Sequence, residues 1–266
     1  MVRISDTEFG QFKRFIFEAA GISLGDAKKA LVSGRLAKRL HACKVNNYGE
    51  YFRLLMSGNA AELQIAIDLL TTNETYFFRE PKHFQFLRQQ ITSGAFRTSS
   101  LRVWSAAGST GEEAYSIAML LEDLLTGQPW EVVASDISTR VLERAQAGHY
   151  PMARIDNLPA GYLQRFCLKG REEQVGTMLV QRALRSKVRF LQVNLNAALP
   201  HLGMFDVVFL RNVLIYFNNE TKRKVVARVL NVLKPGGYLF IGHSESLIDV
   251  TEAVDLVAPA IYRKGP

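Results

Sequence analysis

The chain has 266 residues, of which 48% are hydrophobic and 22% charged, and its formal net charge is +8. This ordinary globular composition argues against disorder, and the length allows one large domain together with a small one. We expect a cytoplasmic protein, because no apolar stretch approaches the ~20 residues of a membrane span and the N-terminus lacks the apolar region of a signal peptide.

The first predicted unit is a small all-α domain over residues 1–72. Apolar side chains recur there at helical spacing, glycines separate the helical segments, and no strand pattern interrupts them. Residues 73–98 predict a linker followed by a lid helix, with Pro81 suited to that helix's first turn.

A basic segment lies within the predicted helical domain. Six Lys or Arg residues stand against one acid between residues 26 and 44. Lys28, Arg35 and Arg39 are spaced to share one face of a helix. The face leaves two readings open, either an anionic partner or ordinary solubility charge.

Residues 99–266 alternate between predicted strands and helices. This alternation predicts an α/β fold with a doubly wound, mostly parallel, Rossmann-like sheet. The predicted strands cover residues 101–107, 130–136, 188–195, 205–214 and 237–244. An amphipathic helix over 219–234 is expected to stop at Pro235-Gly236-Gly237, and residues 260–264 predict a last antiparallel edge strand.

One long connection breaks this alternation, between the strands at 130–136 and 188–195. Residues 149–187 contain the segment GREEQVGTMLVQRAL, which is typical of a turn flanked by short strands. We therefore predict a small β insertion at about 149–187. The two cysteines, Cys43 and Cys167, lie far apart without metal-ligand spacing, so we expect packing roles, no disulfide and no metal.

The cofactor site is predicted at the ends of the first two strands of the sheet. Glycines in the segment 108–111 would let a ligand approach the backbone, and Asp136 is placed to accept hydrogen bonds from the two hydroxyls of a ribose. Glu112 and Glu113 would repel a pyrophosphate at this loop, whereas one of them would attract the ammonium of a methionine tail. Charge therefore favours S-adenosyl-L-methionine over a dinucleotide.

Polar and aromatic residues also follow the later strands. Arg211 and Asn212 are poor core material and suit a pocket lining, whereas Tyr216 alone would be read equally well as a half-buried aromatic. Asn194 and Leu195 stand where an adenine ring would lie. Residues 73–79 are either a plain linker or a lid. The segment around His243 lacks the order of a nucleophile elbow, so we expect it to order a loop.

Five segments in the same order resemble the CheR-type chemotaxis receptor methyltransferases: TTNETYFFRE, VWSAAGSTGEEAYSIA, ASDIS, RNVLIYF and PGGYLFIGHSESL. The likeness covers nearly the whole chain. It implies a class I methyltransferase that transfers a methyl group from S-adenosyl-L-methionine to receptor glutamates, leaving S-adenosyl-L-homocysteine. It also implies partners: the cytoplasmic glutamate-rich helices of membrane-bound receptor arrays.

The resemblance assigns roles to ten residues. Arg79 and Tyr216 would be catalytic in the sense of positioning the reacting groups. The expected cofactor-binding residues are Asn73, Thr75, Arg79, Glu113, Asp136, Asn194, Leu195, Arg211 and Asn212. By the likeness, the first three close over the methionine end, Glu113 holds its ammonium, Asp136 the ribose, and Asn194 with Leu195 the adenine.

One feature departs from the family, the turn GREEQVG in the β insertion. Relatives that dock on a receptor's C-terminal peptide tend to carry a glycine- and proline-containing turn there, so tail docking is not expected. Two other functions stay open: a nucleic-acid (RNA) methyltransferase, and a non-catalytic module that binds S-adenosylmethionine. We expect no nucleic-acid partner, because the fourth strand lacks the Asn/Asp-Pro-Pro-aromatic sequence of amino-methylating enzymes.

Overall fold

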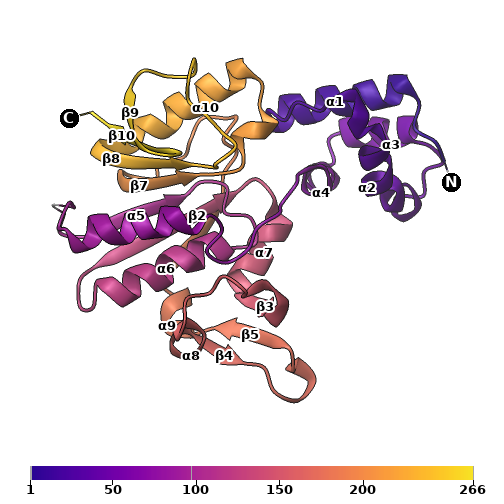
Figure 1. Cartoon of the computed structure of the whole chain (residues 1–266). Coiled ribbons are helices and arrows are strands. Elements are labelled where there is room, and N and C mark those ends of the chain that lie inside the picture. The colour runs from indigo at the N-terminus through magenta and orange to yellow at the C-terminus, as the bar shows by residue number, and fades with distance from the viewer. Residues whose placement is uncertain (1, 97, 266) are drawn as a thin grey trace.

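The computed structural model describes residues 2–96 and 98–265 (Figure 1). In this view a helical N-terminal unit lies to the upper right of a seven-stranded sheet, and a small three-stranded sheet projects below it. None of the helices in these residues is long and apolar enough to cross a membrane. Cys43 and Cys167 are both free thiols.

The N-terminal unit consists of α1 (Asp6–Ala20), α2 (Lys29–Ala42), α3 (Tyr48–Met56) and α4 (Ala60–Leu70), with a 3₁₀ turn at Asp26–Lys28. Ser5 starts α1 with a capping box, since its side chain accepts from the Glu8 N–H while Glu8 accepts from the Ser5 N–H. Phe12, Leu36 and Tyr51 are fully buried where the helices meet. The predicted all-α unit is confirmed.

The prediction of a basic face formed by Lys28, Arg35 and Arg39 is wrong, because two of these side chains are bound to other parts of the protein. Arg35 donates to the backbone carbonyls of Leu70 and Thr71 at 3.1 and 2.9 Å. Arg39 forms a two-pronged ion pair with the buried Glu62. Helical spacing cannot distinguish a free guanidinium from one used in packing. The exposed cations of this region are Lys28, Lys38 and Lys44.

The large sheet has the strand order β6-β2-β1-β7-β8-β10-β9. Its first five strands are parallel, and the last two pairings are antiparallel. The strands are β1 (Leu101–Ser105), β2 (Trp130–Asp136), β6 (Val188–Gln192), β7 (Phe205–Leu210), β8 (Leu233–Ile241), β9 (Val254–Ala258) and β10 (Ile261–Lys264). Strand order reverses between β1 and β7, where doubly wound sheets bind ligands.

Helices cover both faces of this sheet, which confirms the doubly wound prediction. On one face α5 (Pro81–Thr92) and α6 (Glu112–Leu124) pack on Val103 and Phe209. On the other face α10 (Asn219–Asn231) packs on Trp104 and Val208. Neighbouring residues of one strand thus enter opposite cores. The helix α7 (Thr139–Ala147) contacts β2 and β6.

Two C-terminal predictions need correction. The predicted helix over 219–234 ends already at Asn231, and Pro235-Gly236-Gly237 does not stop it but lies inside β8, where the pairing with β7 shifts register. A bulge accommodates residues that would otherwise weaken a strand. The tail strand β10 is antiparallel as predicted, but β9 lies outside it and forms the edge.

The predicted β insertion is a three-stranded antiparallel sheet of order β3-β5-β4. Its strands are β3 (His149–Pro151), β4 (Cys167–Lys169) and β5 (Thr177–Val180), with short helices α8 (Tyr162–Phe166) and α9 (Arg182–Arg185). Further 3₁₀ turns lie at Met152–Arg154, Glu172–Gln174 and, beyond β7, Leu214–Tyr216. Glu172 and Glu173 occupy the turn between β4 and β5.

Candidate cofactor-binding site

A pocket of about 820 Å³, including its open mouth, lies at the carboxyl ends of β1, β2, β6 and β7. This is the position expected of a ligand site in a doubly wound sheet. All ten residues singled out from the sequence line it: Asn73, Thr75, Arg79, Glu113, Asp136, Asn194, Leu195, Arg211, Asn212 and Tyr216.

Asp136 ends β2 and is almost fully buried in the pocket wall. Its carboxylate accepts the Ser109 N–H at 3.0 Å and the Ser138 N–H at 2.9 Å. Burial raises the pKa of Asp136 to about 6, although these hydrogen bonds act in the opposite direction. At neutral pH the group is therefore a carboxylate, with acceptor capacity for a ligand's hydroxyls.

The two adjacent glutamates of α6 differ in direction. Glu113 lines the pocket and accepts from the Ser105 hydroxyl at 2.8 Å and from Arg211 at 2.7 Å. Glu112 is fully buried elsewhere, where Thr110 and Arg154 bind it at 2.6 and 2.9 Å. The structure therefore places only Glu113 where it could meet a cationic ligand.

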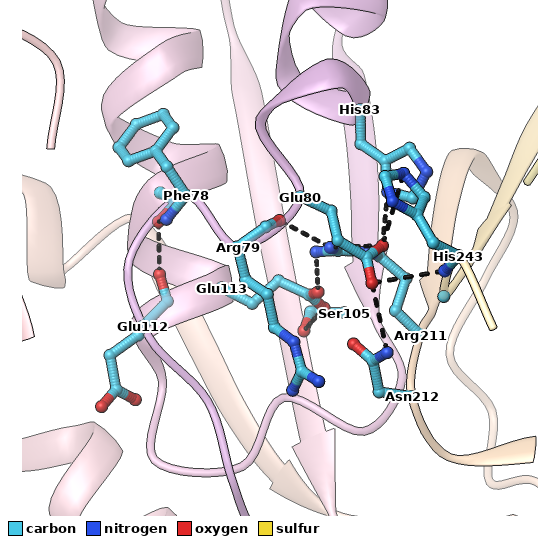
Figure 2. A network of polar contacts seen from close by, with 12 residues as sticks. Phe78, Arg79, Glu80, His83, Ser105, Glu112, Glu113, Arg211, Asn212 and His243 are labelled. Carbon is cyan, nitrogen blue, oxygen red and sulfur yellow. Dashed lines mark hydrogen bonds and ion pairs between the residues drawn. The ribbon is translucent and has the colours of Figure 1, made fainter. Parts of the chain in front are cut away.

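Arg211 follows β7 and links both sides of the pocket (Figure 2). Its buried guanidinium pairs with Glu113 at 2.7 Å and with Glu80 at 2.9 Å. It also donates to the backbone carbonyl of Arg79. Arg211 is thus held by two carboxylates and a carbonyl, and it fixes the segment that carries Arg79.

Four residues of the segment before α5 line the pocket: Asn73, Glu74, Thr75 and Arg79. The Asn73 carbonyl accepts from the Ser109 hydroxyl at 2.9 Å, and the buried Thr75 offers its carbonyl to Arg154 at 3.2 Å. Phe78 and Glu80 both have positive φ, at 52° and 59°. A positive φ costs a non-glycine residue roughly 1–2 kcal/mol, so the surrounding contacts must hold the backbone of Phe78 and Glu80 in this conformation.

Arg79 and Tyr216 lie on the same pocket from opposite elements. The Arg79 guanidinium donates to the Glu74 carbonyl at 2.8 Å and lies over the Tyr76 ring at 5.7 Å. Tyr216 is half-buried, and its carbonyl accepts the Ser23 N–H of the N-terminal unit at 2.8 Å. A cationic group and a phenol thus share one pocket.

The N-terminal unit supplies one wall of the pocket through Ala20 and Ile22. The Asn194 amide donates to the Ala19 carbonyl at 2.6 Å, at the C-terminal end of α1 where carbonyls lack helical partners. Ile22 pairs with Phe217 in an isolated antiparallel bridge. The Asn194 side chain is therefore already engaged with protein.

Several lining residues were missed from the sequence: Ala20, Ile22, Thr71, Thr72, Glu74, Ala106, Ala107, Ser109, Ile137, Val193, Val213 and Phe217. Ile137 and Val193 follow strands and directly adjoin Asp136 and Asn194, so they could have been found from that adjacency. Ala20 and Ile22 carry no such signal, because their place depends on how the helical unit packs.

The segment after β8 orders the pocket rather than lining it, as expected for the residues around His243. The Glu245 carboxylate accepts the backbone N–H groups of Gly242 and Asn212 at 2.6 and 2.9 Å, and that of Ile215 at 3.2 Å. A Cβ at Gly242 would lie 2.4 Å from the Asn212 side chain, so glycine is required for this close approach.

The fold and the pocket together define a class: a doubly wound domain whose ligand site includes the carboxylates of Asp136 and Glu113. A ribose and an ammonium are the groups such carboxylates bind. The family comparison agrees, because the CheR methyltransferase SAM binding domain matches residues 73–262 and the CheR methyltransferase all-alpha domain matches residues 7–71. The chain belongs to this family and is an S-adenosylmethionine-dependent methyltransferase.

Curated relatives span nearly the whole chain. Chemotaxis protein methyltransferases of Escherichia coli and Salmonella typhimurium are 41% and 40% identical, each over 97% of this chain and 91% and 90% of theirs. Chemotaxis protein methyltransferase 2 of Pseudomonas aeruginosa is 39% identical over 96% of this chain and 92% of its own. Among solved structures, the Bradyrhizobium japonicum N-methyltransferase NodS with S-adenosyl-L-homocysteine has a TM-score of 0.43 at 15% identity, covering 74% of this chain and 94% of that chain.

Proposed function

We propose that this enzyme esterifies glutamate side chains on the cytoplasmic, glutamate-rich helices of membrane-bound chemotaxis receptors. The names of its relatives support a chemotaxis substrate, and they do not favour the nucleic-acid alternative. The observation that carries the proposal is the pocket itself, which combines the two carboxylates with Arg79 and Tyr216.

The reaction asks little of the protein in acid–base terms. A glutamate with a pKa of about 4.3 is already ionised at neutral pH, so no general base is needed. The bound cofactor supplies a methyl group on a sulfonium, which is a built-in leaving group. The bound cofactor would thus provide an electrophilic methyl carbon for a glutamate oxygen, with sulfur as the leaving group. The products are a methyl ester and S-adenosyl-L-homocysteine.

The protein's task is then to hold the reactants in line. In this proposal Arg79 orients the incoming carboxylate and Tyr216 lies beside the transferred methyl group. Both act as positioning groups rather than as proton carriers. Glu113 would hold the ammonium of the cofactor and Asp136 its ribose hydroxyls. The carboxylates of Glu113 and Asp136 fit a ligand that is cationic at one end and carries hydroxyl groups near the other.

The remaining lining residues complete the proposed cofactor contacts. Asn73 and Thr75 would close over the methionine end together with Arg79, while Arg211 and Asn212 line the pocket. For Asn194 and Leu195, we propose contact with the adenine through backbone groups and the apolar side chain. This follows because the Asn194 amide already bonds to Ala19.

The direct test is methyl transfer from radiolabelled cofactor to receptor-containing membranes, with RNA and membranes lacking receptors as parallel substrates. We expect base-labile label, typical of a carboxyl ester, on the receptor alone. Label on RNA would support the nucleic-acid alternative. Cofactor binding without transfer to any substrate would support a sensing module.

Receptor tail docking is the partner contact that we do not expect. A docked peptide would add a strand to an exposed edge of the small sheet, and such tethering raises local substrate concentration. Glu172 and Glu173 place two acids in the turn beside β4, which disfavours a carboxylate-ended peptide. Titration with a receptor-tail pentapeptide should show no micromolar binding. Binding that is lost when residues 170–180 are replaced would contradict this expectation.

A further inference from the structure

Glu80 is the centre of a polar cluster behind the pocket (Figure 2). It follows Arg79 directly in the chain but is not among the pocket-lining residues. It stands at the N-cap position of α5, yet its side chain makes no hydrogen bond to the helix. The carboxylate faces Arg211, Asn212 and His243, and its Oε2 also lies 3.4 Å from Nδ1 of His83 in α5.

Each oxygen of the Glu80 carboxylate faces a different set of partners. Oε2 lies 2.9 Å from Arg211 Nη2. Oε1 accepts from the Asn212 amide at 3.3 Å and from the backbone N–H of His243 at 3.2 Å. Burial would raise the pKa of Glu80, but Arg211 and these hydrogen bonds outweigh it and hold the pKa below its usual range. The group is therefore a carboxylate that joins the lid to two loops of the sheet.

A metal ion is the first alternative for this cluster, because ligand atoms of Glu80, His83 and His243 lie within 4.8 Å of one another. Both ring nitrogens of the buried His83 lack a hydrogen-bond partner among the described residues. However, the Arg211 guanidinium lies against the same Glu80 oxygen that a metal would need. A cation there would be repelled at close range in a poorly solvated site, so geometry favours the ion pair over a metal.

The backbone on both sides of Arg79 is what this ion pair restrains. Phe78 and Glu80 have positive φ, and neither is a glycine. The Phe78 N–H donates to the Ser116 hydroxyl at 2.9 Å, which fixes the segment on one side. Arg211 binds both the Arg79 carbonyl and the Glu80 carboxylate, which fixes it on the other. Without the Glu80 carboxylate, Arg211 would hold this side of the turn through the Arg79 carbonyl alone.

We propose that Glu80 is a positioning residue for methyl transfer: through its ion pair with Arg211 it holds the strained Phe78–Glu80 turn that presents Arg79 to the pocket. This inference rests on the proposed function of Arg79. It assigns Glu80 no contact with the cofactor or the receptor. Because Arg79 also closes over the cofactor, loss of Glu80 should lower turnover and should weaken cofactor affinity by less than Arg79→Ala does.

A double-mutant cycle tests whether Glu80 acts through Arg79. The variants are Glu80→Gln, Arg79→Ala and the pair, assayed for turnover on receptor membranes at saturating cofactor. Calorimetry with S-adenosyl-L-homocysteine measures affinity, and thermal unfolding confirms folding. Glu131→Gln is the matched control, because Glu131 is also paired with an arginine, Arg102 at 2.8 Å, but at the opposite end of the sheet.

We expect Glu80→Gln to lower turnover roughly tenfold while changing product affinity less than threefold, whereas Glu131→Gln leaves both unchanged. In the Arg79→Ala background, Glu80→Gln should have no further effect. Effects that multiply would overturn the inference, as would wild-type turnover of Glu80→Gln. If Glu80→Gln does not fold, Glu80→Asp, which keeps the charge on a shorter arm, enters the same cycle under the same criteria. Full turnover by Arg79→Ala would instead refute the proposed role of Arg79.

Discussion

Each end of the large sheet carries an arginine paired with a carboxylate, the half-buried Arg102 at the amino ends of the strands and the buried Arg211 at the carboxyl ends. At the amino ends of the strands, Arg102 pairs with Glu131 at 2.8 Å and donates to two backbone carbonyls, and its guanidinium lies over the Phe205 ring. At the carboxyl ends, Arg211 pairs with Glu80 and Glu113, but its Nε has no partner among the described residues.

Backbone conformation also differs between the two ends of the sheet, and the strained residues lie at the end that holds Arg211. Four non-glycine residues with positive φ gather around the pocket: Phe78, Glu80, Ser109 and Asn212. The amino ends of β1, β2, β7 and β8 contain no such residue within the described strands. Strain and incomplete hydrogen bonding are usually retained where a function needs them. We therefore expect changes at the amino ends to act on stability and changes at the carboxyl ends to act on methyl transfer.

The largest expected effect concerns Arg79. Arg79→Ala should lower turnover by roughly a hundredfold, because misplaced reactants lose about this much, and should also weaken cofactor binding. Tyr216→Phe should lower turnover more than affinity. Arg102→Ala is the matched change at the other end, expected to lower the melting temperature while leaving turnover intact. Parental turnover of Arg79→Ala or Tyr216→Phe at saturating cofactor would remove that residue from the reaction.

Asp136 comes next. Asp136→Ala removes a charged hydrogen-bond partner, worth roughly 1.5–3 kcal/mol, so cofactor affinity should fall about tenfold or more. Calorimetry with S-adenosylmethionine and its demethylated product measures this directly. Unchanged affinity would show that the ribose is not bound at the end of β2.

The same carboxylate should make the cofactor-free protein less stable as pH rises. Because burial raises the pKa of Asp136 from 3.8 to about 6, the unfolded chain releases this proton first. The contribution of Asp136 to the free energy of unfolding therefore declines between about pH 4 and pH 6 and stays low above pH 6. Asp136→Asn should add about 1–2 kcal/mol at pH 7.5, since the amide avoids the buried charge but cannot accept both N–H groups. Equal stability of variant and parent at pH 7.5 would contradict this assignment.

The smallest expected effect lies on the surface of the N-terminal unit. Reversing the exposed Lys28, Lys38 and Lys44 to Glu should slow receptor methylation a few-fold through association, leaving cofactor affinity unchanged. The parental rate should fall as salt rises. A rate insensitive to salt would favour the reading of these lysines as ordinary solubility charge.

The pocket was largely predictable because its residues follow strands. Strand ends are visible in sequence, and parallel strands bring those ends to one edge, so Asp136, Asn194 and Arg211 had to converge. The direction of a side chain was not visible in the same way. Glu112 and Glu113 are adjacent on α6, and residue spacing alone does not tell which faces the ligand. Only the family resemblance selected Glu113.

Features that depend on packing between distant segments were missed. The basic face of α2 includes Arg35 and Arg39 in its spacing, but their partners lie in α4 and the linker. Pro235 and Gly236 stand within a strand because β8 is bulged there against β7. Neither fact follows from local propensity.

The contacts of the N-terminal unit have a consequence for how the molecule could be divided. The all-alpha and SAM binding matches end and begin near residue 72, yet Ala20 and Ile22 form part of the pocket wall. Asn194 and Tyr216 are each bonded to backbone of the helical unit. A fragment limited to the matched SAM binding region would therefore carry every proposed cofactor-binding residue and still leave the pocket open on one side. The matched SAM binding region is therefore smaller than the structural unit that encloses the pocket.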